Sequence, residues 1–169
     1  MTFKKTTLRT ALEILLVEDN PADVRLMQEA FREAGRAPKL NVVRNGQQAM
    51  AFLRREGPYQ ASSRPAFILL DLNLPGADGS EVLAEIKRDR GLRQIPVIVF
   101  STSTQAEDIA RAYDLHANCY ISKPRDLDSL VEAVRMMATF WLGLAAPDPT
   151  QRSRLSTDQA KTLASRKSA

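Results

Sequence analysis

Four short apolar runs constrain the fold of this chain most strongly, because each of them ends in polar residues. The runs cover residues 14–17, 67–70, 97–100 and 119–122. Runs of this length and composition are typical of buried strands in a parallel sheet. In an open parallel sheet the carboxyl ends of the strands lie together, and ligands bind in the crevice beyond them. The polar residues that follow these runs are therefore expected to share one pocket.

Helix signals alternate with the apolar runs. Asn20 is placed to cap a helix that begins at Pro21 and stops at Gly35, and Ser80 is placed to cap a helix that continues to about Arg88. The remaining expected elements are a short strand at 40–43 and helices at 46–55, 105–115 and 127–142. Five strand–helix units in alternation predict a doubly wound α/β fold, in which helices cover both faces of a five-stranded parallel sheet.

Composition indicates one ordinary globular domain. The chain has 169 residues, of which 44% are hydrophobic and 26% charged. We expect an N-terminal extension at 1–11, the domain at 12–146 and a basic, flexible tail at 147–169. The single cysteine, Cys119, and the lack of a long apolar run or signal peptide favour a cytoplasmic protein without a membrane span.

The basic character of the chain belongs to its C-terminal end. Residues 148–169 hold five Lys/Arg and two acids, which leaves the rest of the chain near neutral within a total net charge of +4. A solvated extension is the ordinary interpretation of such a segment. It lacks interleaved aromatic residues, so nucleic-acid binding is not favoured.

The residues at the expected strand ends suit phosphoryl chemistry. Glu18, Asp19 and Asp71 would bring negative charges together, which would repel one another without a cation. Carboxylate oxygens suit Mg²⁺, and Asp71 could attack a phosphoryl group to give an aspartyl phosphate. Lys123 would supply a positive charge for a phosphoryl oxygen, and Ser101 a hydroxyl that can turn toward it.

Each of these residues has an ordinary structural explanation when it is considered alone. An acidic pair after a strand is often turn or helix-cap chemistry, and Ser101 with Thr102 could simply cap a helix. Only their joint placement at four strand ends favours a functional pocket.

The chain resembles the receiver domain of two-component response regulators over residues 13–140. The motifs that carry the resemblance are Glu18-Asp19, Asp71-x-Asn73-x-Pro75-Gly76-x-Asp78-Gly79, Ser101 and Lys123-Pro124. The resemblance implies a flavodoxin-like receiver with strand order 2-1-3-4-5. It also implies a signalling protein that catalyses only its own phosphorylation and dephosphorylation, rather than an enzyme.

The resemblance also implies roles for the pocket residues. Asp71 would accept phosphate from a sensor histidine kinase, and Mg²⁺ would be held by Glu18, Asp19, Asp71 and the backbone carbonyl of Asn73. Lys123 would contact the phosphate, joined to Pro124 by a peptide bond that is often cis in the family. The switch pair would be Ser101 and Tyr120. Thr102 departs from the small residue usual after the switch hydroxyl, and its bulk could narrow access to Asp71.

Two stretches resemble the single-domain regulators that pair with bacterial and cyanobacterial-type phytochromes. They are residues 113–121 and 140–142. This resemblance implies a phytochrome-type kinase as the partner.

The last expected helix carries more apolar surface than one core-facing stripe needs. The core stripe is expected to comprise Leu127, Leu130, Val131, Val134, Ala138 and Trp141. A second arc comprises Ala133, Met136, Met137 and Phe140. It could be covered by the C-terminal segment, or it could form a homodimer contact to which Tyr113 contributes.

Three functions remain open at this point. The first is a stand-alone phospho-signalling module without a DNA-binding domain, acting through a conformational or dimerisation change. The second is an intermediate phosphoryl carrier in a multistep phosphorelay. The third is a haloacid-dehalogenase-type phosphatase, although that family needs an acid two residues after the nucleophile, where this chain has Asn73.

Overall fold

Five parallel strands form the central sheet of the computed structural model, which describes residues 13–35 and 38–141. They are β1 (Glu13–Val17), β2 (Lys39–Val43), β3 (Phe67–Leu70), β6 (Val97–Ser101) and β7 (Cys119–Ser122). Their order is β2-β1-β3-β6-β7 and every pairing between neighbours is parallel. Counted along the chain, this is the predicted order 2-1-3-4-5. The expected extension at 1–11, the end of the domain and the tail lie outside the described residues.

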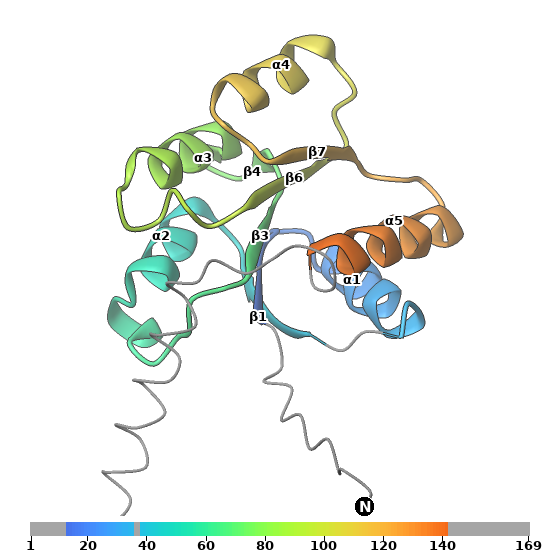
Figure 1. Ribbon diagram of the computed structural model, residues 1–169, viewed down its shortest axis with the longest axis horizontal. Coiled ribbons are helices and arrows are strands. Elements are labelled where there is room, and N and C mark those ends of the chain that lie inside the picture. Colours follow the sequence, from blue (N-terminus) through green and yellow to red (C-terminus); the bar gives the residue numbers. More distant parts are fainter. Residues whose placement is uncertain (1–12, 36–37, 142–169) are drawn as a thin grey trace, which may run out of the picture.

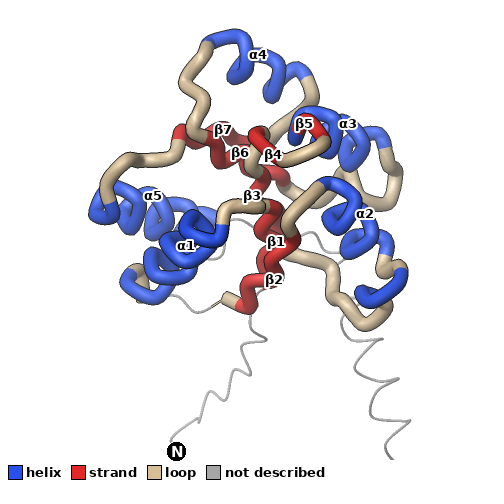
Figure 2. The backbone as a smooth tube through the Cα atoms, turned by 180° about the vertical axis from the view of Figure 1, so that it is seen from behind, coloured by secondary structure: helices blue, strands red, loops and turns tan. Residues whose placement is uncertain are grey.

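Helices cover both faces of the sheet. They are α1 (Pro21–Glu33), α2 (Gly46–Arg54), α3 (Gly79–Arg88), α4 (Ala106–Asp114) and α5 (Leu127–Thr139). Figures 1 and 2 show α1 and α5 side by side on one face and α2 and α3 on the other. A short 3-10 turn, η1 (Gly57–Tyr59), lies in the expected loop before β3. No helix among the described residues is both long and apolar enough to cross a membrane.

The alternation of side chains along β1 divides the core into two layers. Ile14 and Leu16 pack with residues of α1 and α5, whereas Leu15 and Val17 pack with residues of α2, α3 and α4. All four side chains are buried. Because both faces of the sheet are covered, the inner strands are apolar at nearly every position, which explains the continuous runs in the sequence.

Local signals fix where α1 begins. The side chain of Asn20 accepts a hydrogen bond from the N–H of Ala22 at 2.9 Å, and Pro21 occupies the first helical position. Gly35 follows the helix with a φ of +68°, a left-handed conformation that glycine adopts without steric cost. The predicted start and stop of this helix are therefore confirmed.

The predicted cap of α3 was wrong by two residues. A small antiparallel hairpin of β4 (Asn73–Leu74) and β5 (Ala77–Asp78) leads directly into the helix. Asp78 at its end is the cap, and its Oδ1 accepts the N–H of Ser80 at 2.9 Å. Ser80 is instead a buried residue of the first helical turn.

Two residues of α5 differ from their predicted burial. Met137 is only 4% exposed and belongs to the core, whereas Met136 and Phe140 are 61% and 52% exposed. Met137 comes seven residues after the buried Leu130, a spacing of nearly two full turns that returns to the same helix face. Leu127, expected in the core stripe, is 37% exposed at the first position of the helix.

Candidate functional site

The candidate site lies at the carboxyl ends of the strands. Glu18 directly follows β1, and its N–H donates to the carbonyl of Val43 at 2.9 Å. Asp71 directly follows β3, and its N–H donates to the carbonyl of Val17 at 3.1 Å. These bonds extend the parallel pairing one residue past the strands, so both acidic residues are held by the edge of the sheet.

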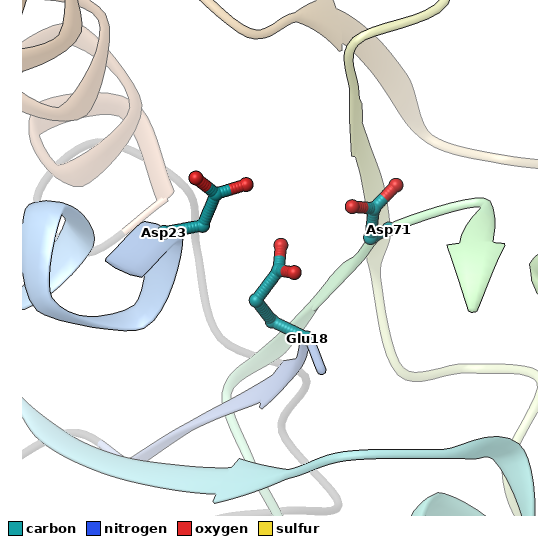
Figure 3. Close-up of side chains that lie close together, drawn as sticks. All are labelled: Glu18, Asp23 and Asp71. Atoms are coloured by element: carbon teal, nitrogen blue, oxygen red, sulfur yellow. The ribbon is translucent and has the colours of Figure 1, made fainter. Parts of the chain in front are cut away.

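Three carboxylates converge in this pocket. Those of Glu18, Asp23 and Asp71 each offer an oxygen within 4.8 Å of the others. Figure 3 shows the three side chains approaching one another from the end of β1, the start of α1 and the end of β3. Glu18 and Asp71 are buried, and Asp23 is half-buried. The arrangement concentrates negative charge where little water can screen it.

Asp23 was not predicted as a site residue. In the sequence it indicated only a helix N-terminus, where an acidic residue is favourable. The Asn20-Pro21 cap starts α1 immediately after the strand end, so the first helical turn faces back over the pocket. That short connection is the signal in the sequence that could have identified it.

Lys123 supplies the positive charge of the pocket. It directly follows β7, and its N–H donates to the carbonyl of Ser101 at 2.8 Å. Its Nζ lies 2.6 Å from Oε2 of Glu18, 2.6 Å from Oδ2 of Asp71 and 2.8 Å from Oδ2 of Asp23. The pocket thus gathers three carboxylates around one ammonium.

Burial and charge shift the pKa values in opposite ways. Burial lowers the pKa of Lys123, but hydrogen bonds to Asp23, Asp71 and Glu18 outweigh burial and raise it above its ordinary value. Burial raises the pKa of Glu18, although the Lys123 ammonium opposes that shift. Lys123 is therefore a cation at neutral pH, and burial makes the charged form of Glu18 less favourable than it is in water.

The backbone after β3 holds the Asp71 carboxylate in place. Oδ1 of Asp71 accepts the N–H of Asn73 at 3.0 Å, which leaves Oδ2 toward Lys123. Gly79 makes this turn possible, because a Cβ at this position would lie 2.4 Å from the Asp71 carbonyl oxygen and 2.6 Å from Cα of Leu72. The start of α3 and the end of β3 can approach so closely only at a glycine.

Ser101 is linked to the loop after β3 by the side chain of Asn73. Its hydroxyl is fully buried, and Nδ2 of Asn73 donates to it at 3.4 Å and to Oγ1 of Thr102 at 3.2 Å. Thr102 itself is exposed. The Asn73 side chain thus joins the loop after β3 to the loop after β6.

Tyr120 is tied to the loop after β6. Its hydroxyl donates to the carbonyl of Ser103 at 3.0 Å, and its backbone N–H donates to the hydroxyl of Tyr113 on α4 at 3.2 Å. Tyr120 is half-buried and Tyr113 is 49% exposed. The residues expected to form the switch therefore flank the loop that connects β6 to α4.

The structure differs at two positions from what the resemblance implies for the pocket. Asp19 is half-buried and does not belong to the carboxylate cluster. The bond between Lys123 and Pro124, which is often cis in the family that the sequence resembles, is trans, like every other peptide bond in the described residues. Trans is the intrinsically preferred form before proline, by roughly 0.5–1 kcal/mol.

Comparison with known proteins agrees with this geometry. A model of the response regulator receiver domain matches residues 14–135. The chain belongs to the response regulator receiver family. The response regulator Rcp1 of Synechocystis sp. is 50% identical to this receiver over 129 residues, which are 76% of this chain and 88% of Rcp1.

Two solved structures resemble this receiver closely. The phosphorylated cyanobacterial phytochrome response regulator RcpA has a TM-score of 0.76 and 52% identity, covering 80% of this chain and 97% of RcpA. The Mn²⁺-bound form of Rcp1 has a TM-score of 0.75 and 47% identity, covering 81% of this chain and 99% of that chain.

The pocket of this receiver fits a hard divalent cation. Its donors are carboxylate oxygens, the ligand type that such cations prefer. The ammonium of Lys123 already stands among these oxygens, so the cluster accepts positive charge at this place. Receiver domains bind a divalent metal, and the acidic cluster is compatible with one here.

Proposed function

We propose that this chain is a single-domain response regulator that accepts a phosphoryl group from a sensor histidine kinase onto Asp71. The observation that carries the proposal is the position of the Asp71 carboxylate. It is buried at the end of β3, and its Oδ2 lies 2.6 Å from Nζ of Lys123. A carboxylate oxygen is the nucleophile that formation of an aspartyl phosphate requires, and the Lys123 ammonium lies beside that of Asp71. The position of Asp71 at the end of β3, with its backbone held by the sheet, favours it as the acceptor over the more exposed Asp23.

The transfer step follows from the orientation of Asp71. One carboxylate oxygen attacks phosphorus while the bond between phosphorus and the donor's imidazole nitrogen breaks, and the electron pair of that bond stays on the nitrogen. Oδ1 accepts the backbone N–H of Asn73, which is fixed, whereas Oδ2 accepts from the side chain of Lys123, which can move to a phosphoryl oxygen. Oδ2 is therefore the candidate nucleophile. Lys123 then donates to a phosphoryl oxygen, where the negative charge has moved.

A metal ion would be held beside Asp71. We assign Mg²⁺ to Glu18, Asp19, Asp71 and the backbone carbonyl of Asn73. A bound Mg²⁺ would orient the phosphoryl oxygens and neutralise their charge. The carboxylates supply the negative charge that attracts the cation. Because Glu18 and Asp71 are buried, little water can compete with the cation for their oxygens.

Ser101 and Tyr120 are the proposed switch. The Ser101 hydroxyl is buried and near Asn73, so it can turn to donate to a phosphoryl group on Asp71. Movement of the β6–α4 loop toward the pocket would disturb the bond between Tyr120 and Ser103. Phosphorylation would in this way change the position of α4.

A homodimer is the proposed output. Exposed apolar side chains lie on α4 and α5, with Tyr113 49%, Met136 61% and Phe140 52% exposed, and with Ala133 half-buried among them. A closed two-fold contact is the commonest way to bury one such patch. Phosphorylation through Ser101 and Tyr120 would then alter the affinity of the dimer.

The proposed partner is a phytochrome-type histidine kinase in the cytoplasm. The support is the similarity to RcpA, described as a cyanobacterial phytochrome response regulator. An intermediate carrier in a phosphorelay would use the same pocket and differs only in passing the phosphoryl group on. A haloacid-dehalogenase-type phosphatase is disfavoured, because the amide of Asn73 occupies the position of its general acid.

Labelling with a small phosphoryl donor tests the assignment of Asp71. Incubation with acetyl phosphate and Mg²⁺ should add one base-labile phosphoryl group per chain, measured by intact mass. Asp71→Asn should remove the label, and Asp126→Asn, which changes an exposed carboxylate outside the pocket, should retain it. Labelling of Asp71→Asn at the wild-type level would refute the assignment.

A further inference from the structure

Lys123 uses all its hydrogen-bond donors on carboxylates. A lysine ammonium carries three N–H bonds and no acceptor. Its three partners are Glu18 and Asp71, both at 2.6 Å, and Asp23 at 2.8 Å. The Lys123 side chain is 9% exposed, so water has little access to it. A phosphoryl oxygen can therefore receive a bond from Lys123 only if one of these contacts is given up.

The three carboxylate partners of Lys123 have different roles in the proposed reaction. Glu18 belongs to the proposed cation site, and Asp71 becomes a neutral acyl group when its negative charge passes to the phosphoryl oxygens. The N–H of Lys123 that donates to Asp71 can then donate to a phosphoryl oxygen instead. Asp23 lies in the same carboxylate cluster, but it is neither a ligand in the proposed cation site nor the residue that reacts. Its side chain is 31% exposed, against 4% for Glu18 and 7% for Asp71.

We propose that Asp23 is a positioning residue that restrains Lys123 and slows phosphoryl uptake by Asp71. This inference rests on the function proposed above. The carboxylate of Asp23 does not react, but it accepts one of the three N–H groups of Lys123. It also places a negative charge within 4.8 Å of the carboxylate that must receive a phosphoryl dianion. Both effects oppose the arrival of the phosphoryl group, so Asp23 limits the reactivity of the pocket toward small phosphoryl donors.

The rate of phosphorylation by acetyl phosphate tests this role. It should be measured at saturating Mg²⁺, established for each variant by its own titration, because removing a carboxylate from the pocket also changes metal affinity. Asp23→Asn should raise the second-order rate constant about three- to tenfold, since a negative charge is removed beside the reacting group. Asp23→Glu, which keeps the charge, should fall between Asp23→Asn and wild type.

A matched variant controls for the loss of charge from α1. Glu29 lies on the same helix, outside the pocket, and pairs with Arg32. Glu29→Gln should leave the rate constant unchanged. Damage to the structure of the pocket would lower the rate in Asp23→Asn, so an increase distinguishes positioning from a purely structural role.

The ammonium of Lys123 gives a second readout that needs neither metal nor phosphate. In ¹⁵N-labelled, metal-free protein, a buried ammonium with three carboxylate partners should exchange slowly enough to give a side-chain signal, assigned by its loss in Lys123→Met. Asp23→Asn should shift or broaden that signal, and Glu29→Gln should not.

Two results would overturn this inference. They are a rate constant for Asp23→Asn at or below that of wild type, and an ammonium signal that does not respond to Asp23→Asn. Failure of the proposed function would look different, because wild type itself would then take up no label at Asp71.

Discussion

At the scale of single residues, the pocket is governed by an imbalance of charge. Three carboxylates share one ammonium, and the two most buried of them, Glu18 and Asp71, face little solvent. Without a metal, the cation that compensates them is Lys123. The same imbalance makes the pocket receptive to a divalent cation, so the features that cost stability are those that serve binding.

The pH dependence of stability should report the burial of Glu18. Burial raises its pKa above the ordinary 4.5, so the folded chain keeps this proton to a higher pH than the unfolded chain does. The free energy of unfolding should therefore fall as pH rises from about 4.5 through the raised pKa. Glu18→Gln should lack this component, and so should gain stability relative to wild type from about pH 4.5 to pH 7.

Urea denaturation in metal-free buffer measures this difference. Asp128→Asn, at an exposed acidic residue of α5, serves as the control and should follow wild type. A difference between Glu18→Gln and wild type that stays constant across the pH range would contradict the account of Glu18.

At the scale of elements, the sequence predicts strands better than it predicts the connections between them. The apolar runs define β1, β3, β6 and β7 to within a residue. In the inner strands β1, β3 and β6, burial on both faces leaves almost only apolar side chains. The β4–β5 hairpin has two residues in each strand, too few for a periodic pattern. Its Pro75-Gly76 centre indicated only a turn.

The same limit applies to the candidate site. Residues that directly follow strands, such as Glu18, Asp71 and Lys123, could be predicted from strand ends alone. Asp23 could not, because its place in the pocket depends on how tightly α1 turns back after β1. Met137 was misplaced for a related reason, since two apolar arcs on α5 overlap and only packing decides between them.

The contact between α3 and the end of β3 gives a prediction at this scale. Gly79→Ala would place a Cβ against the backbone of Asp71 and Leu72, which side-chain rotation cannot relieve. We expect a loss of about 1–3 kcal/mol in the free energy of unfolding and slower phosphorylation, because the turn that orients Asp71 must shift. Urea denaturation and acetyl phosphate labelling measure the two effects.

Gly91→Ala is the matched control for that substitution. The nearest atom to its added Cβ would be a side-chain oxygen of Asp89 at 3.3 Å, which can move. Its effects on stability and labelling should be small. Equal effects of the two substitutions would show that the close approach at Gly79 does not constrain the site.

At the scale of the whole molecule, the pocket and the exposed apolar side chains lie on different parts of the receiver. The pocket is at the carboxyl ends of the strands, whereas Met136 and Phe140 lie toward the end of α5. Hydrogen bonds of Tyr120 with Ser103 and Tyr113 connect β7 to the loop between β6 and α4 and to α4 itself. A phosphoryl group could act on assembly only through such intermediate elements.

Assembly of the receiver should depend on Met136. Met136→Glu would place a charge in the proposed two-fold contact and should give a monomer that still accepts phosphate. Leu26→Glu is the control, because Leu26 is also an exposed apolar residue, 44% accessible, but lies on α1. Sedimentation should give a lower mass for Met136→Glu alone; equal masses for all three proteins would exclude this face as the interface.

Transfer from a histidine kinase tests the central claim most directly. A purified phytochrome-type histidine kinase, autophosphorylated with radiolabelled ATP, is mixed with wild type or Asp71→Asn in the presence of Mg²⁺. We expect the label to leave the kinase and to appear on wild type as a base-labile phosphoryl group, and to stay on the kinase when Asp71→Asn is the acceptor. Equal transfer to both proteins would contradict the account, because the phosphoryl group would then reside on another residue.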